Sequence, residues 1–283
     1  MKTNGFIFGA LIAALATACG SSNSDDNGNP GFPTPVVERA FLAKYPAAAN
    51  VKWEKKGSFS QVDFTLNQVE YEAWYNASGK WLQSEHSVVY TALPVEVKEY
   101  VANNLNYPPA TWRPEMYATV LERLDYPDWY GVELEQGKEE VTLWTDQDIF
   151  RHWDVIADFD GNDVPQAIRS FISVSYKNGY ITEVGKLSDA SYVVNLLDGE
   201  TVKEVYFNST MAWQYTEWPV LLEKVPQVVK SVLDNPAYDM FTVKSVSYQQ
   251  YPSRGWYHFV LKETVAPGRD MTLNIDGEGN IVL

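Results

Sequence analysis

The sequence has little cysteine, little histidine and few basic residues. Cys19 is the only cysteine among 283 residues, so a disulfide within one chain is excluded. Lys and Arg number 22 against 37 Asp and Glu, which gives a formal net charge of −15. Nucleic acids and anionic membrane surfaces are bound by basic residues that neutralise phosphate groups, so we expect neither as a partner.

The three histidines do not form a metal-binding motif. His86, His152 and His258 are far apart in the sequence, and none stands at ligand spacing to another histidine or to Cys19. The chain also has no nucleophile elbow and no glycine-rich phosphate loop. We therefore expect no metal, no cofactor and no enzymatic activity.

One acidic run leaves two interpretations open. Residues 158–163 offer several oxygen ligands within six positions, as a calcium loop does. The glycine of this run is fourth rather than sixth, and no Glu stands at position 12. The alternative is a turn that leads into a helix near Pro165, with Asp163 favourably placed at the positive helix end.

The amino terminus has the order of an export signal. Residues 1–18 carry Lys2, then an apolar run too short to span a bilayer stably, then small residues directly before Cys19. This segment resembles a bacterial lipoprotein signal, which implies a lipid anchor on Cys19 at the outer membrane; a plain secretory signal is the alternative. Residues 19–33 are rich in Gly, Ser, Asn, Asp and Pro and predict a flexible tether. Periplasmic and surface-exposed locations both stay open.

A two-residue period is clearest in the stretch before Trp81. Residues 61–66 and 69–74 alternate between apolar and polar side chains on either side of positions 67–68. This alternation predicts an antiparallel hairpin in which Leu66 pairs with Val69 and one face is buried.

Proline marks four restarts of one pattern. Each restart begins an amphipathic helix that is followed by predicted strands, and the four prolines lie 59, 71 and 61 residues apart: Pro35, Pro94, Pro165 and Pro226. The chain is therefore expected to be an α+β protein of four tandem units, each with one helix and four antiparallel strands. A unit of about 60 residues is marginal alone, so we expect pairs of units in two domains, 34–157 and 158–283.

The first unit also resembles a known family. It has an aromatic-Pro helix end at Tyr45, a Val-x-Trp strand ending at Trp53, a Trp-Tyr-Asn-x-x-Gly-Lys-Trp motif starting at Trp74, and a Leu-Pro-x-x-Val helix starting at Leu93. This order resembles the PepSY-like periplasmic proteins of Bacteroides-type bacteria, whose fold is related to that of β-lactamase inhibitory protein. The resemblance is good over residues 34–105 and thinner beyond. It implies export, helices on an antiparallel sheet and no known catalytic site, but no particular inhibitory activity.

The polar face of the predicted sheet carries the candidate binding residues. Trp74, Trp144 and Tyr206 stand where the alternation predicts solvent, and Asp63 opposes Glu72 on the same face. Aromatic anchors ringed by charge are typical of protein-binding surfaces. We therefore expect a protein partner in the cell envelope to bind this face, unless another unit covers it.

Other functions remain compatible with this sequence. The chain could inhibit an envelope peptidase or β-lactamase, bind glycans, or serve as a structural envelope protein. A glycan-cleaving enzyme would need two carboxylates about 5 to 9 Å apart in a cleft. Asp63 and Glu72 are instead predicted on an open sheet, so this activity is not expected. The partner and the oligomeric state do not follow from the sequence.

Overall fold

The computed structural model describes residues 31–149, 151–265 and 270–282. The predicted signal segment and Cys19 lie outside these residues, as does most of the predicted tether. Within them no helix is both long enough and apolar enough to cross a membrane.

The α-helices begin at the predicted prolines. Thr34 caps the first helix by accepting a hydrogen bond from the Val37 backbone, and Pro94, Pro165 and Pro226 each stand directly before one of the others. The α-helices are α1 Pro35–Lys44, α2 Val95–Ala102, α3 Gln166–Ser175 and α4 Gln227–Lys230. Short 3₁₀ helices cover Tyr90–Ala92, Gly161–Asp163, Leu222–Lys224, Ser231–Asp234 and Pro236–Tyr238.

The strands follow each helix in sequence order. The first two groups are β1 Ala49–Lys56, β2 Phe59–Leu66, β3 Val69–Asn76, β4 Trp81–Val89, β5 Arg113–Pro114, β6 Tyr117–Arg123, β7 Trp129–Gln136, β8 Glu139–Asp146 and β9 His152–Phe159. The later groups are β10 Tyr180–Leu187, β11 Tyr192–Asp198, β12 Thr201–Phe207, β13 Trp213–Pro219, β14 Phe241–Gln250, β15 Gly255–Glu263, β16 Asp270–Asp276 and β17 Ile281–Val282. Large β-branched and aromatic residues dominate them, as suits a pleated and half-buried surface.

The first hairpin has the predicted register. Leu66 pairs with Val69 across the two-residue loop, and Phe64 pairs with Tyr71 further along β2 and β3. Both loop residues, at positions 67 and 68, have positive φ, which matches the right-handed twist of the flanking strands. The buried face predicted for residues 61–74 is thereby confirmed.

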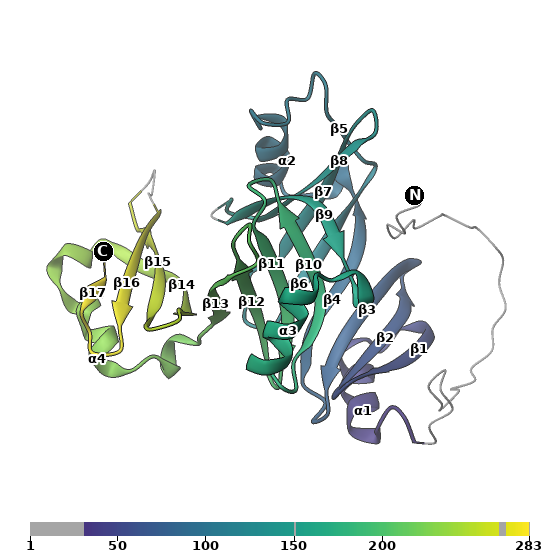
Figure 1. Ribbon diagram of the computed structural model, residues 1–283, viewed down its shortest axis with the longest axis horizontal. Helices are drawn as coiled ribbons and strands as arrows, with labels where there is room; N and C mark the ends of the chain where they lie inside the picture. The colour runs from purple at the N-terminus through teal and green to yellow at the C-terminus, as the bar shows by residue number, and fades with distance from the viewer. Residues whose placement is uncertain (1–30, 150, 266–269, 283) are drawn as a thin grey trace.

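Each helix covers one stretch of the sheet through its own apolar cluster. Val37 and Phe41 of α1 pack on β2 and β3, while Val97 and Val101 of α2 pack on β6 to β8. Two further clusters join α3 to β10–β12 and α4 to β14–β16. A large antiparallel sheet with few helices is thus the architecture, and Figure 1 shows the helices spread along it from α1 to α4.

The sheet continues through the middle of the chain without a break. β9 pairs with β8 on one side and with β10 on the other, and Val155 lies opposite Leu187 in the second pairing. The expected boundary between residues 157 and 158 therefore falls inside β9. Main-chain hydrogen bonds join the two halves of the protein.

The face without helices turns inward. Phe59 and Leu82 of the first group of strands pack against Leu197 and Val202 of β11 and β12. A second cluster joins β6 to β9 on the same side of the sheet. Because the sheet folds back on itself, surfaces that a flat sheet would leave in water become an interior.

Candidate functional site: the inner face and the surface hollows

The three predicted aromatic anchors are buried rather than exposed. Trp74 is 4% exposed, Trp144 is 8% exposed and Tyr206 is 9% exposed. Trp74 contacts the ring of Tyr180 at 5.2 Å between centroids, and Trp144 belongs to an apolar cluster with Trp129. The predicted exposure was wrong because other parts of the same sheet cover this face. These residues cannot form an open binding surface in this conformation.

The two predicted acidic residues have different surroundings. Asp63 is exposed and lies opposite Glu72 in the register, as predicted. Glu72 is half-buried and accepts hydrogen bonds from the Trp74 indole and, at 2.6 Å, from the Gln61 amide. Burial raises the pKa of both carboxyls. Glu72 therefore holds an interior tryptophan in place.

Four carboxyl groups face one another where the inner faces meet. Glu72 of β3 is directly opposite Glu85 of β4, and Asp158 of β9 shares its side of the sheet with Glu183 of β10. Burial is the main cause of raised pKa values, to about 8 for Glu85, about 7 for Glu183 and about 6 for Asp158. The neighbouring carboxylates raise Glu85 further. This cluster favours protons at pH values where free carboxyls are ionised.

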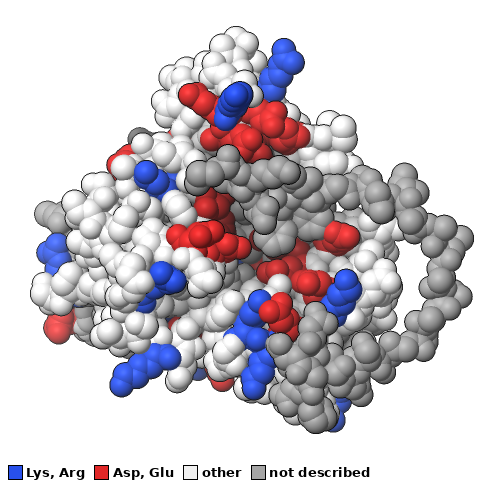
Figure 2. All heavy atoms as spheres, turned by 45° about the vertical axis from the view of Figure 1, so that its right-hand side comes forward, with Lys and Arg blue, Asp and Glu red and all other residues white. Residues whose placement is uncertain are grey.

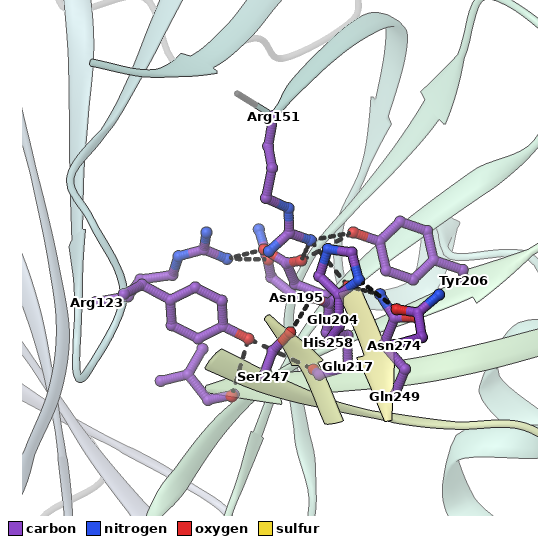
Figure 3. A network of polar contacts seen from close by, with 12 residues as sticks. Arg123, Arg151, Asn195, Glu204, Tyr206, Glu217, Ser247, Gln249, His258 and Asn274 are labelled. Carbon is purple, nitrogen blue, oxygen red and sulfur yellow. Dashed lines mark hydrogen bonds and ion pairs between the residues drawn. The ribbon is translucent and has the colours of Figure 1, made fainter. Parts of the chain in front are cut away.

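A network of buried ion pairs lies beside these carboxyls. Arg123 Nη1 bonds Glu204 at 2.7 Å, and neither side chain is exposed. Arg151 bonds the same carboxylate and reaches Glu217 at 3.2 Å, as Figure 3 shows. Burial opposes ionisation of Glu204, but the two arginines outweigh it and hold its pKa below its usual range. Two positive and two negative charges thus offset one another in the interior.

Polar residues continue this network across neighbouring strands. Asn195, Glu204 and Glu217 stand side by side in the registers of β11, β12 and β13, and Gln249 of β14 follows next to Glu217. Ser247 donates to Glu217 at 2.5 Å, so the network also includes the last group of strands. The partners lie up to 81 residues apart in the chain. The network ties together parts of the sheet that are distant in sequence.

One hollow opens at the edge of this network. It has a volume of about 260 Å³ and is lined by Arg151, His152, Trp153, Tyr206, Tyr215, Glu217, Gln249 and His258. Tyr215 stacks on Tyr206 at 4.2 Å, and His258 Nδ1 is 2.7 Å from Asn274 Oδ1. Two of the three histidines meet here although they come from different repeats, while His86 stacks on Tyr71 at 4.4 Å.

A larger hollow lies on the outer surface where α2 ends. It measures about 580 Å³ and is bounded by α2, the loop that follows and the start of β9. Its carboxylates are Glu96, Glu99 and Asp154, and Tyr100 lies with its ring 5.5 Å from that of His152. Three asparagines and two aliphatic residues complete the lining. In contrast to the inner face, this surface is open.

The acidic groups considered as cation sites are arranged differently from one another. Across the described residues, Glu133, Glu135 and Glu140 alone place three acidic or histidine ligand atoms within 4.8 Å of one another, and all three are exposed. The run 158–163 forms the end of β9 and a 3₁₀ turn that leads towards α3. Pro165, rather than Asp163, occupies the cap position of α3, where no side-chain hydrogen bond is made.

Sequence reasoning found part of this arrangement. The alternation placed Tyr206 on the polar face of the sheet, and its hydroxyl donates a hydrogen bond to Glu204 of the network. Sequence reasoning missed Arg123 at the end of β6, Glu217 of β13 and Arg151, which directly precedes β9. The sequence feature that could have indicated these ion pairs is a basic residue on a strand face that otherwise carries Glu.

The fold and the site together define a class of protein: a repeat protein whose long antiparallel sheet carries helices outside and a paired polar network inside. The PepSY-like family, described as beta-lactamase-inhibitor-like, matches residues 58–151, 151–196 and 190–282. The chain belongs to this family. The resemblance seen in the first unit is thereby confirmed, and the match extends it through the later repeats.

Solved structures from Bacteroides are similar to about half of the chain. A BLIP-like protein from Bacteroides fragilis is 25% identical, with a TM-score of 0.41, and the alignment covers 50% of this chain and 99% of that one. A DUF2874 family protein from Bacteroides ovatus is 19% identical, with a TM-score of 0.38 and coverage of 43% and 87%. The comparison with curated proteins found no match.

Proposed function

We propose that this chain is a non-enzymatic, lipid-anchored binding protein of the cell envelope that recognises a protein partner. The observation that carries the proposal is the match to a beta-lactamase-inhibitor-like family across most of residues 58–282. The order of residues 1–19 supports export and lipidation at Cys19. In this proposal the four helix-and-strand units act as one rigid body rather than as separate modules.

The partner would bind the outer surface rather than the inner face. Trp74, Trp144 and Tyr206 are occupied by contacts within the chain, so they have little area to offer. Figure 2 shows acidic side chains gathered near the centre and the top of one face of the molecule. With a net charge of −15, such a surface favours a partner with a basic patch.

Inhibition of an envelope hydrolase is the second candidate function. The family description favours it, because it refers to inhibitor-like proteins. An inhibitor acts by occupying a target's active site, so it needs a rigid surface that survives binding. The buried ion pairs of Arg123 and Arg151 would supply that rigidity.

Capture from a native envelope extract tests the binding proposal. The lipid-free protein, immobilised through its carboxyl terminus, should retain one protein in stoichiometric amount, and that protein after separate purification should bind with a Kd below about 10 μM. Retention of many proteins that are equally released by moderate salt would contradict specific recognition. Adding the chain to purified β-lactamases and envelope peptidases tests inhibition, and unchanged initial rates at micromolar concentration would reject it.

A further inference from the structure

The hollow of about 260 Å³ at the edge of the buried network has walls that the chain itself holds in place. Tyr206 and Glu217 of this lining are only 9% and 3% exposed. Arg151 is fixed by both, because its Nη2 atom donates to the Tyr206 hydroxyl at 2.9 Å and to Glu217 at 3.2 Å. Figure 3 shows His258, another member of the lining, beside these groups. A ligand would therefore meet side chains that are already ordered, which lowers the cost of binding.

The charges beside this hollow offset one another. Arg151 and Glu217 are the charged members of its described lining, and they form an ion pair. Behind them Arg123 is paired with Glu204. A charged ligand would approach both signs at once, so its attraction to one partner would be opposed by repulsion from the other. The hollow therefore favours an uncharged ligand.

Some hydrogen-bonding groups of the lining are unused. Across the described residues, the Tyr215 hydroxyl and the Trp153 indole N–H form no hydrogen bond, and both side chains are half-buried. His258 Nδ1 lies 2.7 Å from the acceptor Asn274 Oδ1, which assigns a proton to Nδ1 and leaves Nε2 as an acceptor. The hollow thus offers both donors and an acceptor. This combination suits hydroxyl groups, because a hydroxyl can donate and accept.

Aromatic rings complete the lining. Trp153 meets Tyr206 edge to face at 5.9 Å, and Tyr215 stacks on the other side of the group. A sugar ring carries hydroxyl and apolar C–H groups side by side, and Trp and Tyr are amphipathic in the same way. The volume lies just below the roughly 300 Å³ at which pockets for drug-sized ligands begin, so it suits one ring rather than several. We propose that this hollow binds one uncharged sugar ring, a ligand additional to the protein partner.

Methyl glycosides of glucose, galactose, mannose and N-acetylglucosamine are suitable probes. Saturation-transfer NMR titrations of the lipid-free protein measure their binding. We expect at least one of them to bind with a Kd of about 1 mM, the value that about 13 non-hydrogen atoms give at the ligand efficiency of drug-sized molecules. The uronic acid and the amino sugar derived from the best ligand carry a charge, and each should bind at least about fivefold more weakly.

Single substitutions locate the binding in this hollow. Tyr215→Phe removes only a hydroxyl without a partner among the described residues, so it should weaken binding about fivefold and leave the thermal midpoint unchanged. Trp153→Phe removes the free indole N–H and should have an effect of similar size, with thermal unfolding as the check that the variant is folded. Tyr117→Phe, at an exposed position on β6, is the matched control and should bind like wild type.

Four results would overturn the proposal. They are absence of saturation transfer to all four glycosides at about 20 mM, tighter binding of a charged derivative, wild-type affinity in Tyr215→Phe, and an equal loss in Tyr117→Phe. If Trp153→Phe does not fold, Tyr215→Phe alone decides. Each of these results concerns the sugar site, and none of them bears on recognition of a protein partner.

Discussion

Replacing Glu85 with glutamine should remove much of the pH dependence of folding stability. Glu85 lies opposite Glu72, and the charges of Glu183 and Asp158 also act on it. Burial, aided by these charges, raises its pKa from 4.5 to about 8. The folded protein therefore binds this proton more tightly than the unfolded chain does. Protonated Glu85 therefore makes its full contribution to folding stability below about pH 4.5, and this contribution is lost as the pH rises through about 8.

The size of the effect follows from the pKa. Each tenfold change in proton affinity corresponds to about 1.4 kcal/mol, so a pKa that rises from 4.5 to about 8 corresponds to about 5 kcal/mol when Glu85 is fully ionised. Rearrangement and water entry reduce such costs in real proteins. We therefore expect the free energy of unfolding of Glu85→Gln to exceed that of wild type by about 2 kcal/mol at pH 9. At pH 5 we expect the two values to be nearly equal.

Urea unfolding followed by tryptophan fluorescence at pH 5, 7 and 9 measures this difference. Other charged groups lie near the cluster, namely Asp63, Glu54, Lys52 and Lys56 on β1 and β2, Arg123 on β6, and Glu133 on β7. They are present in both proteins, so the comparison reports the ionisation of Glu85 together with its effect on Glu72, Glu183 and Asp158. Glu70→Gln, an exposed position on β3, is the matched control and should follow wild type. A Glu85→Gln protein that keeps the wild-type pH slope, or that is less stable at pH 9, would refute the reasoning.

Three further substitutions test the interior. Trp74→Ala should lower the free energy of unfolding by about 3 to 5 kcal/mol in denaturant titrations, because removal of a buried indole leaves a cavity. A change below about 1 kcal/mol would indicate that this side chain is exposed. Arg123→Met should cost about 3 to 5 kcal/mol at neutral pH and less in acid, where Glu204 can accept a proton; equal losses at both pH values would contradict the ion-pair explanation. Gly131→Ala should cost about 1 to 3 kcal/mol, since the new methyl group would lie 2.8 Å from an indole carbon, whereas Gly277→Ala has open space and should be near neutral by thermal unfolding.

Local features of the fold were predictable because they depend on neighbouring residues. The alternation of residues 61–74 specified the hairpin register, and the loop at 67–68 has the backbone conformation that such hairpins require. The prolines at 94, 165 and 226 marked helix starts to within one residue. In each case the physical cause lies within one turn or one pair of strands.

The candidate site was less predictable because it depends on contacts between distant segments. Alternation assigns Trp74 and Glu72 to one face of a strand, but it does not say whether that face meets water or another part of the sheet. The covering residues, such as Leu197, lie more than 100 positions away. The partners of Arg123 and Glu204 are likewise separated by 81 positions. Contacts between distant segments of the sheet determine which side chains are buried.

The strand pairing between β9 and β10 makes the two halves of the chain depend on each other during folding. A cut in the turn before α3 leaves this pairing intact, so both pieces should remain associated and cooperative. Synthesised apart, each half would instead present an unpaired ladder of amide and carbonyl groups at its edge. We therefore expect the two halves to reconstitute the fold as complementing fragments, and we expect neither half to be stable alone.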